Sequence, residues 1–259
     1  MRKYLALALA ACFALAVGMA SLATAGEETQ TEVAKIKPSK FSKSKYQYLT
    51  QINTITTFID PALGQPKSGE RTILDLPKQL KFNTKGTAKC KTDAAGLEAA
   101  ATTEDAIAVC GKKSLVSDAK GSTAEVTVSQ GASEPLIIDI QVSAFNEDGK
   151  KLLLFSKPIG DFSVIPASIL IGELKKFGKV KGRPAESKKN KKAYKESLDV
   201  TIPPLAAGAI SFFEVTIPKS AKYIEGKCSS KKMMWQATTF FSDGSSTTDT
   251  HSAKCKPKK

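Results

Sequence analysis

Residues 135–158 read PLIIDIQVSAFNEDGKKLLLFSKP, and this stretch decides the fold class. Two runs rich in β-branched, aliphatic and aromatic residues, 137–145 and 152–155, flank the polar turn EDGK at 147–150. An Asp-Gly turn between two such runs is a strong hairpin signal, because glycine tolerates the positive φ that tight hairpin turns require. The stretch therefore predicts two antiparallel strands, at 135–145 and 151–158.

Similar short segments recur along most of the chain. Segments rich in Val, Ile, Thr or Phe and bounded by Gly, Pro or Asp predict strands at 46–58, 71–76, 122–129, 162–174, 197–203, 209–218, 233–242 and 246–251. Asp243 and Gly244 predict a second hairpin turn. About ten short strands indicate an all-β fold, an antiparallel β-sandwich over residues 46–255. One Greek-key or jelly-roll unit and two similar immunoglobulin-like halves both satisfy this pattern.

One interval favours helix over strand. Residues 94–101 are rich in alanine, and Thr102 and Thr103 are candidates to cap a turn that continues to Ile107. The sequence therefore predicts a short helical insert on the β frame.

The first 25 residues have the pattern of a signal peptide. Arg2 and Lys3 precede an apolar run over 5–22, and the small residues ATA at 23–25 form a cleavage motif. A transmembrane anchor is the first alternative, and no stop-transfer run follows the apolar segment. Lipidation at Cys12, the last residue of the lipoprotein box LAAC, is the second alternative. The apolar run before this box would be unusually short. We therefore expect a secreted or cell-surface protein.

The segments on either side of the predicted sandwich are basic. Residues 26–45 are polar and rich in lysine, so a flexible lead-in is expected there. Residues 256–259 are expected to form a basic tail.

Four cysteines remain after the signal peptide: Cys90, Cys110, Cys228 and Cys255. Export places them in an oxidising compartment, where two disulfides are expected. Three connectivities are possible, and the clustering along the chain favours Cys90 with Cys110 and Cys228 with Cys255. A four-thiolate zinc site is the alternative, but no Cys-x2-Cys pair occurs.

The chain is strongly basic. Its formal charge of +14 falls to +12 when the signal peptide, with two basic residues and no acid, is removed. Residues 175–195 hold ten basic residues and one acid, so they predict an exposed connecting loop. Contact with anionic cell-surface polymers through Lys188, Lys189, Lys191 and Lys192 is the functional interpretation of this loop, and a solvated connector is the structural one. No specific nucleic-acid partner is expected, because few aromatic residues interleave the charges.

The sequence carries no recognised catalytic, cofactor-binding or metal-binding motif, so no cofactor and no enzymatic activity are expected. Ser-x-x-Lys spacing occurs at residues 42–45 and 229–232, where chance is a sufficient explanation. Asp139, Glu147 and Asp148 are expected on a strand face or in a turn, and His251 is expected to be a surface or half-buried residue. The hydrophobic core is expected to include Ile138, Phe213 and Trp235.

A set of residues spread over most of the chain resembles a known group of proteins. These are residues 80–83 (LKFN) before Cys90, Cys110 with Ser114 and Val116, Leu152 to Leu154, Cys228, Trp235, Asp243 with Gly244, and Cys255. They resemble secreted, β-rich, two-disulfide proteins of actinobacterial type, a group without a known activity. The resemblance implies an exported fold held by disulfides, and it assigns no site residues.

These observations favour a secreted non-catalytic structural or binding module of the cell envelope or extracellular space. No transmembrane anchor is expected after cleavage of the signal peptide. The alternative is a secreted hydrolase of unfamiliar type, which would use carboxylates or a serine brought together from separate loops.

Overall fold

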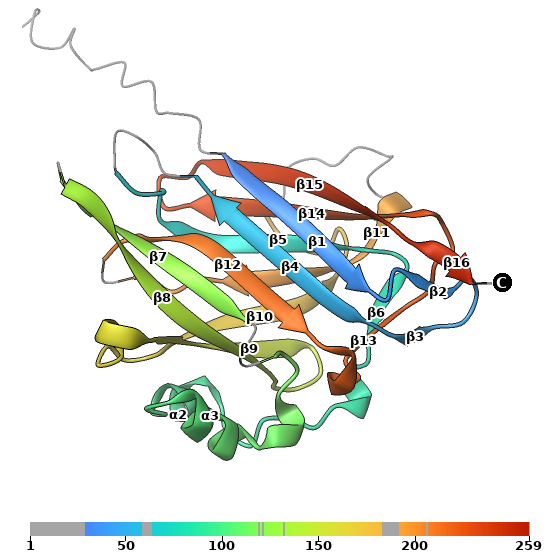
Figure 1. Cartoon of the computed structure of the whole chain (residues 1–259), viewed down its shortest axis with the longest axis horizontal. Helices are drawn as coiled ribbons and strands as arrows, with labels where there is room; N and C mark the ends of the chain where they lie inside the picture. The colour runs from blue at the N-terminus through green and yellow to red at the C-terminus, as the bar shows by residue number, and fades with distance from the viewer. Residues whose placement is uncertain are drawn as a thin grey trace, which may run out of the picture.

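A computed structural model describes residues 29–58, 64–118, 120, 122–131, 133–182, 192–205 and 207–258. Their main feature is one antiparallel sheet of 11 strands (Figure 1). In spatial order the strands are β1 (Gln30–Lys37), β4 (Thr50–Thr57), β12 (Ala209–Ile217), β7 (Thr123–Gln130), β8 (Ser133–Asn146), β9 (Lys151–Pro158), β10 (Ser168–Lys176), β11 (Tyr194–Thr201), β5 (Gly69–Pro77), β14 (Lys232–Phe241) and β15 (Ser246–Lys254). The predicted all-β class is confirmed. The predicted signal peptide, 1–25, lies outside the described residues.

The sheet is nearly closed, because its two edge strands, β1 and β15, lie beside each other (Figure 1). Side chains bridge this seam: the backbone N–H of Glu32 donates to Asp249 Oδ2 at 2.7 Å, and Gln30 Nε2 donates to the Ala237 carbonyl at 2.8 Å. Early strands pair with late ones, β4 with β12 and β5 with β14, on the two sides of the consecutive run from β7 to β11. The sandwich architecture itself stays a prediction.

Two small sheets extend this frame. One has the order β3 (Gln47–Tyr48), β13 (Ile224–Gly226) and β6 (Leu80–Phe82), and the other pairs β16 (Lys256–Lys258) with β2 (Lys40–Ser42) in parallel. Four short 3-10 helices complete the described elements: η1 (Thr84–Gly86), η2 (Lys112–Ser114), η3 (Gly160–Phe162) and η4 (Lys219–Ala221).

Strands lie in both basic end segments, where the sequence predicted a flexible lead-in and a tail. Within the predicted lead-in of residues 26–45, β1 pairs with β4 along its whole length and β2 pairs with β16. The predicted tail of residues 256–259 contains β16. Gln30, Glu32 and Ala34 alternate inward in β1, and Gln30 Nε2 and the backbone N–H of Glu32 gain partners across the seam. This polar segment therefore forms a strand, although its composition is typical of a disordered one.

The predicted hairpin at the centre of the sequence is confirmed as β8 and β9. Asp148 Oδ1 accepts the backbone N–H groups of Lys150 and Lys151, and these bonds, led by the one from Lys150, hold the pKa of Asp148 below its ordinary value. β9 is buried on both faces. Leu152 and Leu154 face the sheet interior, and Leu153 and Phe155 pack against the helical insert, which explains the continuous apolar run.

The helical insert is confirmed as α2 (Ala94–Glu98) and α3 (Thr103–Cys110). Thr102 caps α3: its side chain accepts the Asp105 N–H, and the Asp105 carboxylate accepts the Thr102 N–H in return. Buried Leu97 and Ala106 share an apolar cluster with Phe155 of the sheet. The insert therefore covers the outer face of the sheet at β9.

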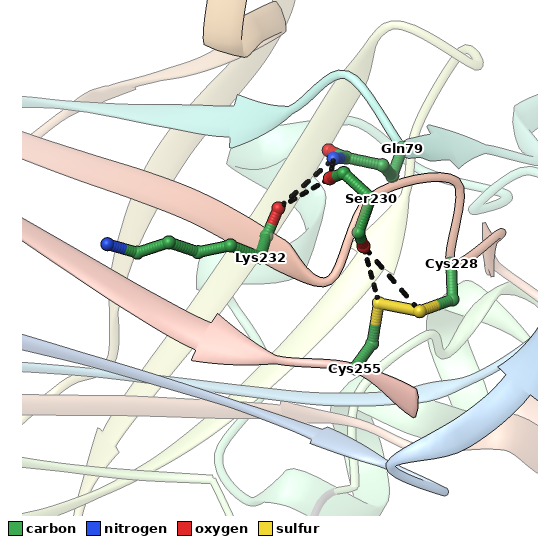
Figure 2. Close-up of a disulfide and its surroundings, with 5 residues drawn as sticks. All are labelled: Gln79, Cys228, Ser230, Lys232 and Cys255. Atoms are coloured by element: carbon green, nitrogen blue, oxygen red, sulfur yellow. Dashed lines mark hydrogen bonds between the residues drawn. A yellow bond between two sulfur atoms is a disulfide. The ribbon is translucent and has the colours of Figure 1, made fainter. Parts of the chain in front are cut away.

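Both predicted disulfides are confirmed, Cys90 with Cys110 at the helical insert and Cys228 with Cys255 beside β14 and β15. Two disulfides indicate an oxidising or extracellular environment. Figure 2 shows the Ser230 carbonyl oxygen directed at the second bridge, 3.0 Å from Sγ of Cys255. Because a disulfide sulfur carries no hydrogen, this is a close contact and not a hydrogen bond.

Two expected boundaries differ from the structure. The predicted strand at 162–174 begins only at Ser168, because a turn that includes η3 precedes it. The predicted loop at 175–195 is shorter, since β10 extends to Lys176 and β11 begins at Tyr194. Of the predicted core residues, Trp235 is fully buried, and Phe213 and Ile138 are half-buried against the core.

Candidate ligand cavity

A cavity of about 110 Å³ lies inside the nearly closed sheet. Alternate residues of its strands line the wall, as expected where side chains point in turn to the inside and the outside. Most of the lining is apolar, with Ile55 of β4, Leu74 of β5, Leu154 of β9, Val200 of β11 and Phe213 of β12 as examples. The wall is thus built by strands from all parts of the chain.

The cavity lining follows β4 along its length. This strand contributes Gln51, Asn53, Ile55 and Thr57 to the wall. Six residue steps from Gln51 to Thr57 correspond to about 20 Å of strand. An extended alkyl chain laid along β4 would meet each of these residues in turn.

Several large apolar residues that line the cavity are only half-buried, although they face the interior. Examples are Ile55, Leu198, Val200, Phe213 and Val215. A space of about 110 Å³ in an apolar core costs roughly 2.6 kcal/mol at ~24 cal/mol per Å³. An apolar group that fills it would restore those packing contacts.

The polar part of the wall is small. Gln51, Asn53, Thr57, Thr72, Thr239 and Lys67 supply it. Asn53 links the wall to the seam behind it, because its Nδ2 lies 3.4 Å from Glu32 Oε1 and its Oδ1 accepts from Gln51 Nε2. Thr72 and Thr239 pair through their hydroxyl oxygens at 3.1 Å. Most polar groups of the wall are therefore engaged with other side chains.

Glu32 is the strongest electrostatic feature near the cavity. It is 1% exposed, and burial raises its pKa to about 9, with a further contribution from the nearby Asp249 carboxylate. The hydrogen bond from Asn53 acts in the opposite direction and is weaker than these effects. Glu32 therefore keeps its proton at neutral pH, and the seam beside the cavity stays uncharged at this position.

One charged side chain lines the cavity. Lys67 Nζ lies 3.0 Å from Asp243 Oδ2 in the turn between β14 and β15. Hydrogen bonds from Ser245, together with Lys67, lower the pKa of Asp243 to about 2. This turn, with Lys67, Gly69 and Phe241, marks one end of the cavity, which we call the Lys67 end.

A second cluster of charged groups lies away from the cavity wall. Asp199 accepts two hydrogen bonds from Arg71, at 2.6 and 2.9 Å, and one from Lys175 at 2.8 Å. Burial raises the pKa of Asp199, but the bonds from Arg71 and Lys175 outweigh this effect and hold it below its ordinary value. All three groups are satisfied by one another, which is typical of a structural ion cluster.

Those residues singled out in the sequence that the structure describes do not assemble into one site. Lys188, Lys189 and Lys191 lie outside the described residues, and Lys192 is exposed beside β11. Asp139 and Asp148 are exposed, Asp139 on β8 and Asp148 in the hairpin turn that Glu147 shares. His251 is half-buried on β15, opposite Trp235 in the register.

The two Ser-x-x-Lys pairs have local structural roles. The Ser42 hydroxyl accepts the backbone N–H of Lys45 at 2.9 Å. In the second pair, the backbone carbonyl of Lys232 accepts from Ser230 Oγ and from Gln79 Nε2, at 2.7 and 3.3 Å (Figure 2). These contacts hold turns together and involve backbone atoms of the lysines.

Neither Glu32 nor the cavity is evident from the sequence. Glu32 lay in the segment read as a flexible lead-in, and only the alternation of Gln30, Glu32 and Ala34 against exposed neighbours pointed to a strand. The cavity-lining residues had the pattern of ordinary core positions. Their spacing in the sequence contains no information about unfilled volume.

Further searches of the structure and of known proteins returned few constraints. In the part of the chain that the structure describes, no group of three His, Cys, Asp or Glu side chains is placed to hold a metal ion. No helix within those residues is long and apolar enough to cross a membrane. No protein-family model and no curated protein matches the chain.

Proposed function

We propose that the protein is a secreted, non-catalytic binding module that holds a single-chain apolar ligand inside a barrel-like sheet. The observation that carries this proposal is the cavity, whose large apolar wall residues face inward and yet stay half-buried. Apolar cavities inside β-folds commonly hold one small ligand. Export is supported by the two disulfides and by the signal-peptide pattern of residues 1–25.

The chemistry of the wall sets the ligand class. Apolar residues dominate it, and burial of their surface against an alkyl chain contributes about 25 cal/mol per Å². The run of wall residues along β4 suits one extended chain, and most polar wall groups are engaged with other side chains. We therefore expect affinity to rise with alkyl chain length until the cavity is filled.

Val200→Phe tests this function. Val200 is half-buried on β11 and lines the cavity, so a larger side chain there occupies ligand space. We expect the variant to bind a fluorescent single-chain fatty acid at least tenfold more weakly than the unchanged protein, and to keep its melting temperature or raise it, because the new ring packs into existing volume. Fluorescence titration and calorimetry measure the two quantities.

Thr201→Phe is the matched control. It adds the same ring one residue later on the same strand, where the side chain is exposed and faces away from the cavity. Its fatty-acid affinity should equal that of the unchanged protein. Equal losses in both variants, or no detectable binding by the unchanged protein to alkyl chains of any length, would refute the proposed function.

A further inference from the structure

A row of exposed lysines lies at the other end of β15 from the Lys67 end. Lys254, Lys256 and Lys258 alternate with Cys255 and Pro257, and Cys255 is buried. Alternation along an extended chain places every second side chain on one face, about 7 Å apart. The three lysines therefore project from one side of this extended segment, and we call them the lysine row.

Neighbouring strands widen this row on both sides. Lys232 of β14 lies directly opposite Lys254, and Lys40 of β2 is the partner of Lys256 in the parallel pair. Lys232 and Lys40 are both exposed. Directly opposite residues share one face of a sheet, so five positive charges converge on the same surface.

Nothing in the described structure neutralises these charges. Among the described residues, none of the five lysines has a carboxylate within ion-pair distance, whereas Lys67, Lys81 and Lys175 each do. Like charges placed directly opposite one another in a sheet are destabilising. The pairing of Lys232 with Lys254 and of Lys40 with Lys256 thus costs stability that an anionic partner would return.

The second disulfide holds the row in place. Cys255 lies between Lys254 and Lys256, and its bond to Cys228 joins the row to the loop that leads into β14 (Figure 2). The Cys255 N–H donates to the Lys231 carbonyl at 3.1 Å, and the Lys256 N–H donates to the Ser39 carbonyl at 2.8 Å. The backbone beneath the charges is therefore fixed before any ligand arrives, which lowers the entropy lost on binding.

We propose that the lysine row, with Lys232 and Lys40, is a binding site for a linear polyanion that carries repeated phosphate or carboxylate groups. Charges that repeat along one extended segment match the repeated anionic groups of a linear polymer. The row lies eight residue steps along β15 from Ser246, about 27 Å from the Lys67 end, so a bound polymer leaves that end of the cavity uncovered. This site differs from the loop at residues 175–195, for which the sequence suggested contact with anionic polymers.

The test compares a row variant with a control variant that loses the same charge, and with a variant of the loop at residues 188–192. The row variant carries Lys254→Gln, Lys256→Gln and Lys258→Gln. The matched control variant carries Lys85→Gln, Lys112→Gln and Lys113→Gln, at three exposed lysines of η1 and η2. A third variant carries Gln at Lys188, Lys189, Lys191 and Lys192. Binding to linear inorganic polyphosphate, to polyglutamate and to vesicles of anionic phospholipid is measured for each protein over a series of salt concentrations.

We expect the row variant to bind its polymer about tenfold more weakly, with the slope of log affinity against log salt reduced by about 2, or 0.7 for each lost lysine. The control variant should lose much less, and the comparison of polyphosphate with polyglutamate identifies the preferred anion. Equal losses in the row and control variants, a loss confined to the variant of residues 188–192, or tighter binding to vesicles than to either polymer would overturn the proposal.

Discussion

Trp235→Ala is expected to lower the free energy of unfolding by about 3–5 kcal/mol, because it removes a large, fully buried side chain from the main core. Trp235 lies on β14 among Met233, Ala237 and the other inward-facing residues of the sheet. The surrounding strands are held by ladders on both sides, so they cannot close the resulting space. The loss should therefore approach the upper part of this range.

Denaturant unfolding followed by circular dichroism measures this loss. Trp235 is the only tryptophan, so fluorescence cannot follow the variant. Trp235→Phe is the control: it keeps an aromatic ring and removes an indole N–H that has no hydrogen-bond partner among the described residues. It should cost less than half as much. A loss below 1 kcal/mol for Trp235→Ala would show that the residue does not support the core.

Glu32→Gln is expected to stabilise the protein at pH 7 by up to roughly 3 kcal/mol. The folded protein holds the pKa of Glu32 at about 9, against about 4.5 when the chain is unfolded. Between these values the folded state binds one more proton than the unfolded state, so stability falls by about 1.4 kcal/mol for each pH unit. The contribution of Glu32 is complete below pH 4.5 and is lost as the pH rises through 9.

Glutamine resembles the protonated carboxyl group and does not titrate, so the variant should lack this pH dependence. The stability difference between the two proteins should vanish near pH 4 and grow steadily towards pH 9, as measured by urea unfolding at several pH values. Glu134→Gln, a change at an exposed residue of β8, should leave the profile unchanged. Parallel profiles for the unchanged protein and Glu32→Gln would contradict a protonated Glu32 in the seam.

Local patterns in the sequence were sufficient for most of the elements. The hairpin of β8 and β9 follows from an Asp-Gly turn between apolar runs, and the capping of α3 follows from Thr102 ahead of Glu104 and Asp105. Both depend on contacts between residues only a few positions apart, which a single sequence displays directly. The proximity of the cysteines in each pair predicted the disulfides for the same reason.

Contacts between distant segments were beyond the reach of the sequence. β1 was hidden because its inward residues Gln30 and Glu32 are polar, and their burial depends on Asn53, Ala237 and Asp249 from other strands. The parallel pairing of β2 with β16 joins the two ends of the described chain. Such pairings depend on long-range packing, whereas local composition predicts a flexible lead-in at residues 26–45 and a basic tail at residues 256–259.

By itself, then, the sequence determined the all-β class, most strands of the large sheet, the helical insert and the two disulfides, because hydrophobic alternation, turn residues and cysteine spacing are local properties. The tertiary structure alone decided the near closure of the sheet, the cavity inside it, the protonated state of Glu32 and the alignment of Lys254, Lys256 and Lys258 with Lys232 and Lys40. Each of these depends on which distant strands become neighbours, because burial, unfilled volume and charge proximity exist only after the strands have packed.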